Sequence, residues 1–150
     1  MSRRWTRSGL SVVLLIMSYG ANAAKSEERW LAYSKTAVGI TGNIRLSPTR
    51  LVMVRQTFPL KVITDNPNFD VSIFQGDSHP VQARVLMVLR RMDPKLLNGN
   101  TFGCGRPIKW IAVWRENQGS MLGLAAFSGE TIPTSVRGAG FCGSYHYTRL

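Results

Sequence analysis

The segment IKWIAVWRENQGSMLGLAAF, residues 108–127, decides the fold that we expect for this chain of 150 residues. Its first part alternates apolar residues between two faces, which is the period-2 pattern of a β-strand. Gln118-Gly119 then supplies a turn, and MLGLAAF (121–127) forms the partner strand. The sequence therefore predicts an antiparallel hairpin here. The alternating residues are Trp110, Ala112 and Trp114 on one face and Ile111 and Val113 on the other.

Short segments of the same type precede and follow this hairpin, and residues typical of turns separate them. We expect turns at Ser47-Pro48, Asp65–Asn68 and Gly76-Asp77, and a loop rich in Gly, Pro and Ser at 128–140. Seven or eight short strands at regular spacing predict a mainly β fold, either an antiparallel barrel or a sandwich. The expected strands cover 38–46, 50–55, 59–64, 69–74, 81–91, 108–115, 121–127 and 141–149.

Three segments leave room for helical structure. Residues 24–36 fit a short helix capped by Ser26, and they equally fit an extended lead-in to the first strand. Residues 81–91 fit both patterns, but their valines and the neighbouring strands favour a strand. Asp93 to Leu97 is expected to form a single helical turn, followed by Asn98-Gly99, a pair typical of positive φ.

Residues 1–23 have the three parts of a cleavable export signal. Arginines form a positive first part, and Leu10 to Met17 is an apolar run too short to span a bilayer, which needs roughly 20 residues. Ala21 and Ala23 are small residues of the kind that a signal peptidase accepts, so we predict cleavage after Ala23. The expected product is a periplasmic or secreted protein, with a single β-rich domain over 24–150 and no stable membrane anchor.

The chain is strongly basic, with 19 Lys and Arg residues against 8 Asp and Glu residues. Three of the basic residues belong to the signal, so the mature chain carries 16 against 8, a net charge of +8. The basic residues are spread singly, with Arg90-Arg91 as the only adjacent pair after the signal, and no zinc-ligand or RNA-binding motif accompanies them. We therefore expect no nucleic acid partner. Anionic envelope polymers and anionic lipid headgroups are the partners that the charge favours.

Two cysteines remain in the exported chain, Cys104 and Cys142. An even pair in an oxidising compartment predicts a structural disulfide. Neither cysteine belongs to a C-x-x-C motif, which is typical of catalytic thiols. The bond would join the loop before the Trp110 strand to the last strand.

Four segments together resemble a group of small exported proteins of alphaproteobacteria. The resemblance covers most of the mature chain, and the segments recur in the same order. It implies a periplasmic or secreted bacterial protein with a cysteine pair, and it implies no catalytic residue. The segments are ITGNIRLSPTRLVM (40–53), DPKLLNGNTFGCG (93–105), WIAVW (110–114) and FCGSYHYTR (141–149).

Histidines are the first residues to consider for catalysis, and the chain has two, His79 and His146. Two histidines exclude a three-histidine zinc site, and we expect neither a metal nor a cofactor. His79 lies in a turn, whereas His146 shares a strand face with Ser144. A small hydrolase using His146 is therefore one hypothesis, although no G-x-S-x-G motif is present to expose a nucleophile. We expect no catalytic residue.

The aromatic residues give the better indication of where a partner would bind. Trp110 and Trp114 share one strand face, and Tyr145 and Tyr147 share another; in a β protein such residues typically pack in the core. An alternative is a platform that faces solvent and binds sugar rings or a protein through aromatic and arginine side chains. The candidate binding surface comprises Arg106, Lys109, Trp110, Trp114, Arg115, Tyr145, His146 and Tyr147.

The sequence thus favours a non-catalytic binding or interaction module on a rigid β scaffold. The expected partner is an envelope component, such as an anionic polymer, or another protein. The alternatives are the small hydrolase using His146 and an inhibitor or secretion accessory protein on the same scaffold.

Overall fold

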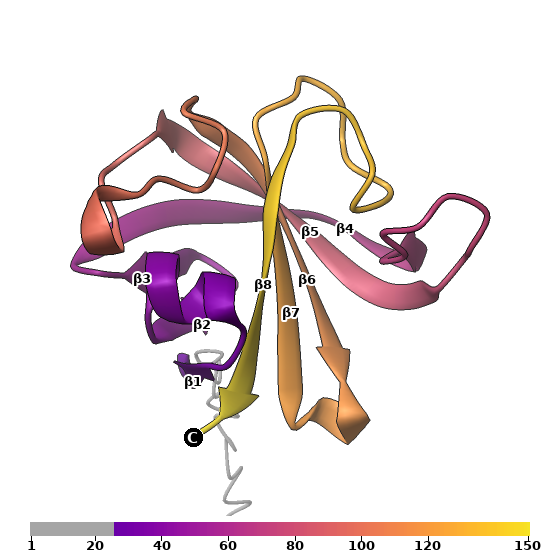
Figure 1. The fold of residues 1–150 in the computed structure, drawn as a ribbon, viewed down its shortest axis with the longest axis horizontal. Helices are drawn as coiled ribbons and strands as arrows, with labels where there is room; N and C mark the ends of the chain where they lie inside the picture. Colours follow the sequence, from indigo (N-terminus) through magenta and orange to yellow (C-terminus); the bar gives the residue numbers. More distant parts are fainter. Residues whose placement is uncertain (1–25) are drawn as a thin grey trace, which may run out of the picture.

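In the computed structural model, which describes residues 26–150, eight strands follow one another in chain order around a closed antiparallel barrel (Figure 1). β1 also pairs with β8, which closes the barrel. The expected mainly β, antiparallel fold is confirmed, in its barrel form. The predicted signal peptide at 1–23 lies outside the described residues. The strands are β1 (Glu28–Ala32), β2 (Ile44–Ser47), β3 (Arg50–Met53), β4 (Gln56–Asp70), β5 (Pro80–Met92), β6 (Ile108–Glu116), β7 (Met121–Phe127) and β8 (Phe141–Arg149).

The second half of the chain folds as its pattern predicts. β6 and β7 form the expected hairpin, whose turn is the 3₁₀ segment η3 (Asn117–Gly119). Residues 81–91 lie within strand β5, and 141–149 coincide with β8. The segment 24–36, which fitted a helix or an extended lead-in, contains strand β1 from residue 28.

The predicted strand over 38–46 is wrong in its first half. Ala37–Thr41 form η1, a single π-helical turn, and strand β2 begins only at Ile44. The Ser34 hydroxyl accepts a hydrogen bond from the Ala37 N–H at 3.2 Å, which favours a turn at this point. Ala37 and Thr41, spaced four residues apart, are both fully buried. Helical spacing therefore buries this segment better than the strand spacing on which the prediction depended.

The predicted turn at Asp65–Asn68 is also wrong, because β4 runs through it without a break. The pairing of β4 with β5 shifts between Asn66 and Phe69, and this irregularity accommodates Pro67, which cannot donate a ladder hydrogen bond. β4 ends at Asp70, so residues 71–74 of the expected next strand belong instead to the loop that returns to β5. Figure 1 shows this long β4–β5 hairpin extending away from the rest of the barrel.

The expected helical turn at Asp93 to Leu97 lies further along the chain, where Leu97–Gly99 form the 3₁₀ segment η2. Asn98 (φ 54°) and Gly99 (φ 72°) have the positive φ that their residue types predict. None of the described helices has the length and apolarity of a membrane span.

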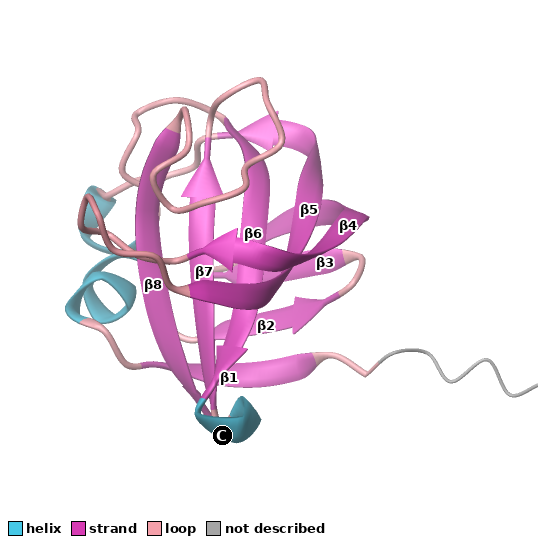
Figure 2. Cartoon of the chain, turned by 90° about the vertical axis from the view of Figure 1, so that its right-hand side faces the viewer, coloured by secondary structure: helices cyan, strands magenta, loops and turns pink. Residues whose placement is uncertain are grey.

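Two apolar clusters lie on opposite faces of the curved sheet. The inner cluster fills the barrel, and the outer cluster packs against β5, β6 and β7 beneath Val136 of the 128–140 loop. Figure 2 shows helical turns alongside β8 and the longer loops gathered beyond one end of the strands. The largest inner residues are Trp30, Phe58, Phe102, Tyr145 and Tyr147, and the largest outer ones are Phe69, Trp110, Trp114 and Phe127.

One end of the barrel is closed by the segment between β5 and β6. Phe102 from this segment is fully buried, and its carbonyl accepts a hydrogen bond from the Tyr145 hydroxyl at 2.9 Å. The predicted disulfide between Cys104 and Cys142 is present and joins the same segment to β8, with a Cα–Cα distance of 4.8 Å. A bond that closes a loop of this length stabilises a fold by about 4 kcal/mol in the chain-entropy model.

Candidate functional site

The opposite end of the barrel has an open mouth, close to η3, with a cavity of about 590 Å³. A cavity of this size at the mouth of a barrel is a common place for a small-molecule site. Its floor is apolar, and its rim is polar and charged. The floor residues are Leu46, Leu86, Val113 and Leu122, and the rim residues are Ser26, Glu28, Ser47, Pro48, Asp65, Gln82, Arg84, Trp114 and Arg115. We call these residues the barrel mouth.

Two arginines line the mouth because strand alternation directs them to the inner face of the sheet. Arg84 lies two residues before Leu86 on β5, and Arg115 lies two residues after Val113 on β6. Leu86 and Val113 both belong to the inner core. The inner face therefore changes from apolar to charged where the strands reach the mouth.

The Arg115 guanidinium bridges strands that are not neighbours in the barrel. It donates to both carboxylate oxygens of Glu28 on β1, at 2.7 and 2.6 Å, although β7 and β8 separate β6 from β1 around the wall. It also lies over the indole of Trp30, 5.0 Å from the ring centroid, and the Trp30 N–H donates to Glu28 at 3.1 Å. This cluster holds a charged group across part of the opening.

Arg84 has its own carboxylate partner on the neighbouring strand. Its Nε donates to Asp65 of β4 at 2.8 Å. The hydrogen bond to Asp65 raises the pKa of Arg84 above its usual value, against the opposing effect of burial. Both side chains are well exposed, at 39% and 50%, so the pair contributes little to stability and holds the arginine in position at the rim.

The two rim arginines retain N–H donors beyond those that they use toward their carboxylate partners. An arginine has five N–H donors. Arg115 uses only one nitrogen toward Glu28, and Arg84 uses two toward Asp65. Both oxygens of Glu28 are already bonded. These remaining donors can bind an acceptor, and an anionic acceptor forms the strongest hydrogen bonds with guanidinium.

The aromatic members of the predicted binding surface do not form a platform. Trp110, Trp114, Tyr145 and Tyr147 are all buried, the tryptophans in the outer cluster and the tyrosines inside the barrel, as core packing predicts. The Tyr147 hydroxyl bonds Thr41 at 2.7 Å. Burial raises the pKa of Tyr145 to about 12 and also raises that of Tyr147. No exposed aromatic surface exists at these positions for sugar or protein to bind.

The basic members of that surface lie in separate places. Lys109 forms an ion pair with Glu130 and lies 5.2 Å from the centroid of the Trp110 ring. Arg106 is exposed in the segment before β6. Among the predicted residues, Arg115 and part of the otherwise buried Trp114 line the barrel mouth.

His146 lies on the outer face of β8, beside the outer cluster. Its ring is 6.0 Å from that of Trp114, and its Nδ1 is 3.7 Å from the Glu116 carboxylate. Among residues 26–150, the His146 ring forms no hydrogen bond with a serine, and no three His, Cys, Asp or Glu side chains are grouped as metal ligands. His146 and Glu116 therefore form a histidine–carboxylate pair, but no serine hydroxyl in the described part of the chain lies within hydrogen-bond distance of the His146 ring to act as a nucleophile.

Sequence reasoning missed Glu28, Arg84 and the apolar floor. Arg84 is the one that a strand pattern could have revealed, because a charge among alternating inner residues of 81–91 marks the point where the inner face meets water. Glu28 could not be placed, since its partner is 87 residues away.

Comparison with known proteins adds nothing to this description, since no family model, curated protein or solved structure matches the chain. The resemblance to small exported alphaproteobacterial proteins therefore stays a prediction.

Proposed function

We propose that this chain is an exported, non-catalytic binding module whose barrel mouth holds a small amphipathic molecule with an anionic head group. The observation that supports this most directly is the position of Arg84 and Arg115, which face inward at the open end, above an apolar floor. The ligand's apolar part would contact Leu86 and Leu122, and its head would accept hydrogen bonds from the spare guanidinium donors.

The cavity volume of about 590 Å³ lies within the range of sites for ligands of drug-like size. Within a cell envelope, a fatty acid or a related lipid fragment has the required combination of an apolar chain and an acidic head. The disulfide supports an oxidising, exported location, where such molecules are components of the surroundings.

Calorimetric titration with dodecanoate and with dodecanol tests this proposal. The two probes share an apolar chain and differ in the charge of the head. We expect dodecanoate to bind about tenfold more tightly, because a hydrogen bond to a charged group contributes about 1.5–3 kcal/mol. Arg84→Leu should remove most of this preference, and Arg90→Leu, on the same strand but outside the mouth, should leave it unchanged.

A second variant tests the location without changing the charge. Gln82 is exposed on the rim, so Gln82→Trp should narrow the opening without disturbing the core, and it should weaken the binding of both probes. Equal affinity for the acid and the alcohol in the parent protein would contradict an anionic head group. Undiminished binding to the Gln82→Trp variant would contradict the mouth as the site.

A further inference from the structure

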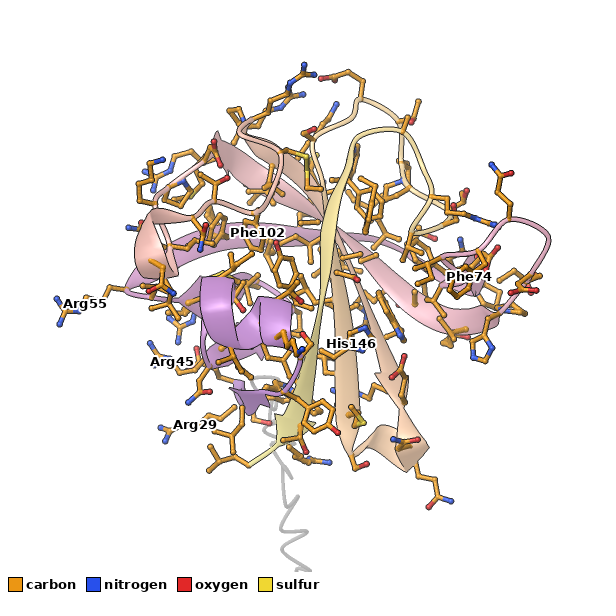
Figure 3. All side chains as sticks on the ribbon, viewed as in Figure 1. Arg29, Arg45, Arg55, Phe74, Phe102 and His146 are labelled. Carbon is orange, nitrogen blue, oxygen red and sulfur yellow. A yellow bond between two sulfur atoms is a disulfide. The ribbon has the colours of Figure 1, made fainter. Side chains whose placement is uncertain are left out.

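A second charged region lies on the outer face of β1, β2 and β3, away from the barrel mouth. Arg29, Arg45 and Arg55 line a shallow groove of about 410 Å³ whose floor includes Val52 and Val54. Figure 3 shows the three arginines projecting from the same side of the molecule, opposite the side that carries Phe74. We call these three residues and the two valines the arginine face.

Two of these arginines are placed where they repel each other. Arg29 on β1 lies directly opposite Arg45 on β2 in the strand register. Like charges in directly opposed positions destabilise a sheet. Glu27 bonds Arg45 at 3.2 Å and Arg50 at 2.8 Å. Within residues 26–150, the Arg29 side chain forms no ion pair or hydrogen bond, so this repulsion is only partly relieved inside the chain.

The third arginine is presented by an unfavourable turn. Val54 and Arg55 join β3 to β4 with φ of 46° and 65°, in the left-handed region. A β-branched residue such as valine is rarely found there, so this conformation lowers the stability of the fold. Arg55 is exposed and, among the described residues, has no ion-pair partner. The turn thus orders a charged side chain at the groove at the expense of stability.

The combination of charge and apolar floor indicates the kind of partner. Guanidinium groups bind phosphate oxygens through two hydrogen bonds, and a bilayer surface offers phosphates above acyl chains. Val52 and Val54 are only partly buried and line the same groove as the arginines, with Val52 opposite Arg45 in the strand register. A soluble polyanion would leave these valines exposed to water, whereas the interface of a bilayer would cover them.

We propose that the arginine face docks the protein on a membrane surface containing anionic phospholipid. Each basic side chain near such a surface raises the affinity about fivefold by electrostatic attraction, and this attraction weakens as the salt concentration rises. This inference is independent of the proposed ligand in the barrel mouth, because it uses different residues on a different surface.

Co-sedimentation of the purified protein with vesicles provides the test. Vesicles of phosphatidylcholine alone are compared with vesicles that also contain phosphatidylglycerol, at low and at high salt. The test variant is Arg29→Gln/Arg45→Gln/Arg55→Gln. The matched control, Arg90→Gln/Lys95→Gln/Arg106→Gln, removes the same charge from other exposed positions. Melting temperatures establish that both variants are folded.

We expect binding to the phosphatidylglycerol vesicles that decreases with salt, and little binding to phosphatidylcholine alone. The test variant should bind roughly a hundredfold more weakly, and the control should change much less. Equal losses in the two variants would overturn the arginine face in favour of net charge. Loss of binding on Ile73→Ser/Phe74→Ser, with none on the arginine variant, would overturn it in favour of the exposed apolar loop. Binding to soluble polyphosphate without binding to vesicles would refute a membrane partner.

Discussion

At the scale of single residues, the outer core depends on Gly123. This glycine on β7 lies beneath the indole of Trp114, and a Cβ atom at position 123 would overlap the ring. Trp114 in turn stacks on Phe69 with centroids 6.1 Å apart, and its N–H donates to Glu116 at 2.7 Å. The indole therefore has no simple way to move aside.

We expect Gly123→Ala to lower the free energy of unfolding by about 1–3 kcal/mol, the usual cost of forcing an extra carbon into a packed core. Urea denaturation followed by tryptophan fluorescence measures this change. Gly39→Ala is the control, because a Cβ atom there meets nothing within 4 Å. Unchanged stability of the Gly123 variant would show that the outer core is loosely packed.

At the scale of elements, the strands with strict alternation were predictable and the irregular ones were not. β6 and β7 alternate between the two apolar clusters, so local sequence determines them, whereas residues 81–91 of β5 also fitted a helix and were assigned from their valines and neighbouring strands. β4 contains Asn66-Pro67-Asn68, which resembles a turn locally, but pairing with β5 on one side keeps it extended. The barrel mouth could not be predicted from local sequence either, because Arg115 and Glu28 come into contact only after the barrel has closed.

The β3–β4 turn gives a prediction about an element. Asparagine tolerates positive φ far better than valine, and the chain itself has asparagine at φ 54° and 48° in Asn98 and Asn117. Val54→Asn should therefore raise the free energy of unfolding by about 1 kcal/mol, seen as a higher urea midpoint with an unchanged slope. The reverse change in the β6–β7 turn, Asn117→Val, should lower it. Destabilisation by Val54→Asn would mean that the valine side chain packs more favourably than its backbone strain costs.

At the scale of the whole molecule, two carboxylates hold the 128–140 loop over the outer core. Glu130 in the loop bonds Arg91 at 3.0 Å and also pairs with Lys109, and Asp70 of β4 accepts from Arg137 of the loop at 2.7 Å. The hydrogen bonds from Arg91 and Lys109 lower the pKa of Glu130 to about 2. The pKa of Asp70 is lowered by hydrogen bonds from the backbone N–H groups of His79 and Ser72 and by the charge of Arg137.

A carboxylate whose pKa is lower in the folded than in the unfolded protein stabilises the fold at any pH above its unfolded pKa, which is about 4. This contribution disappears as the pH falls toward the folded pKa. We therefore expect constant stability from neutral pH down to about pH 5, then a loss as the pH falls further, with a red shift of tryptophan emission as the loop leaves Trp110. The Trp110 N–H bonds Gly129 of this loop at 3.0 Å. The Glu130→Gln variant should be less stable than the parent protein at neutral pH, and it should lose less stability on acidification. The Asp77→Asn variant is the control for the removal of one negative charge. An equally steep acid loss in Glu130→Gln and in the parent protein would show that other carboxylates control the acid stability.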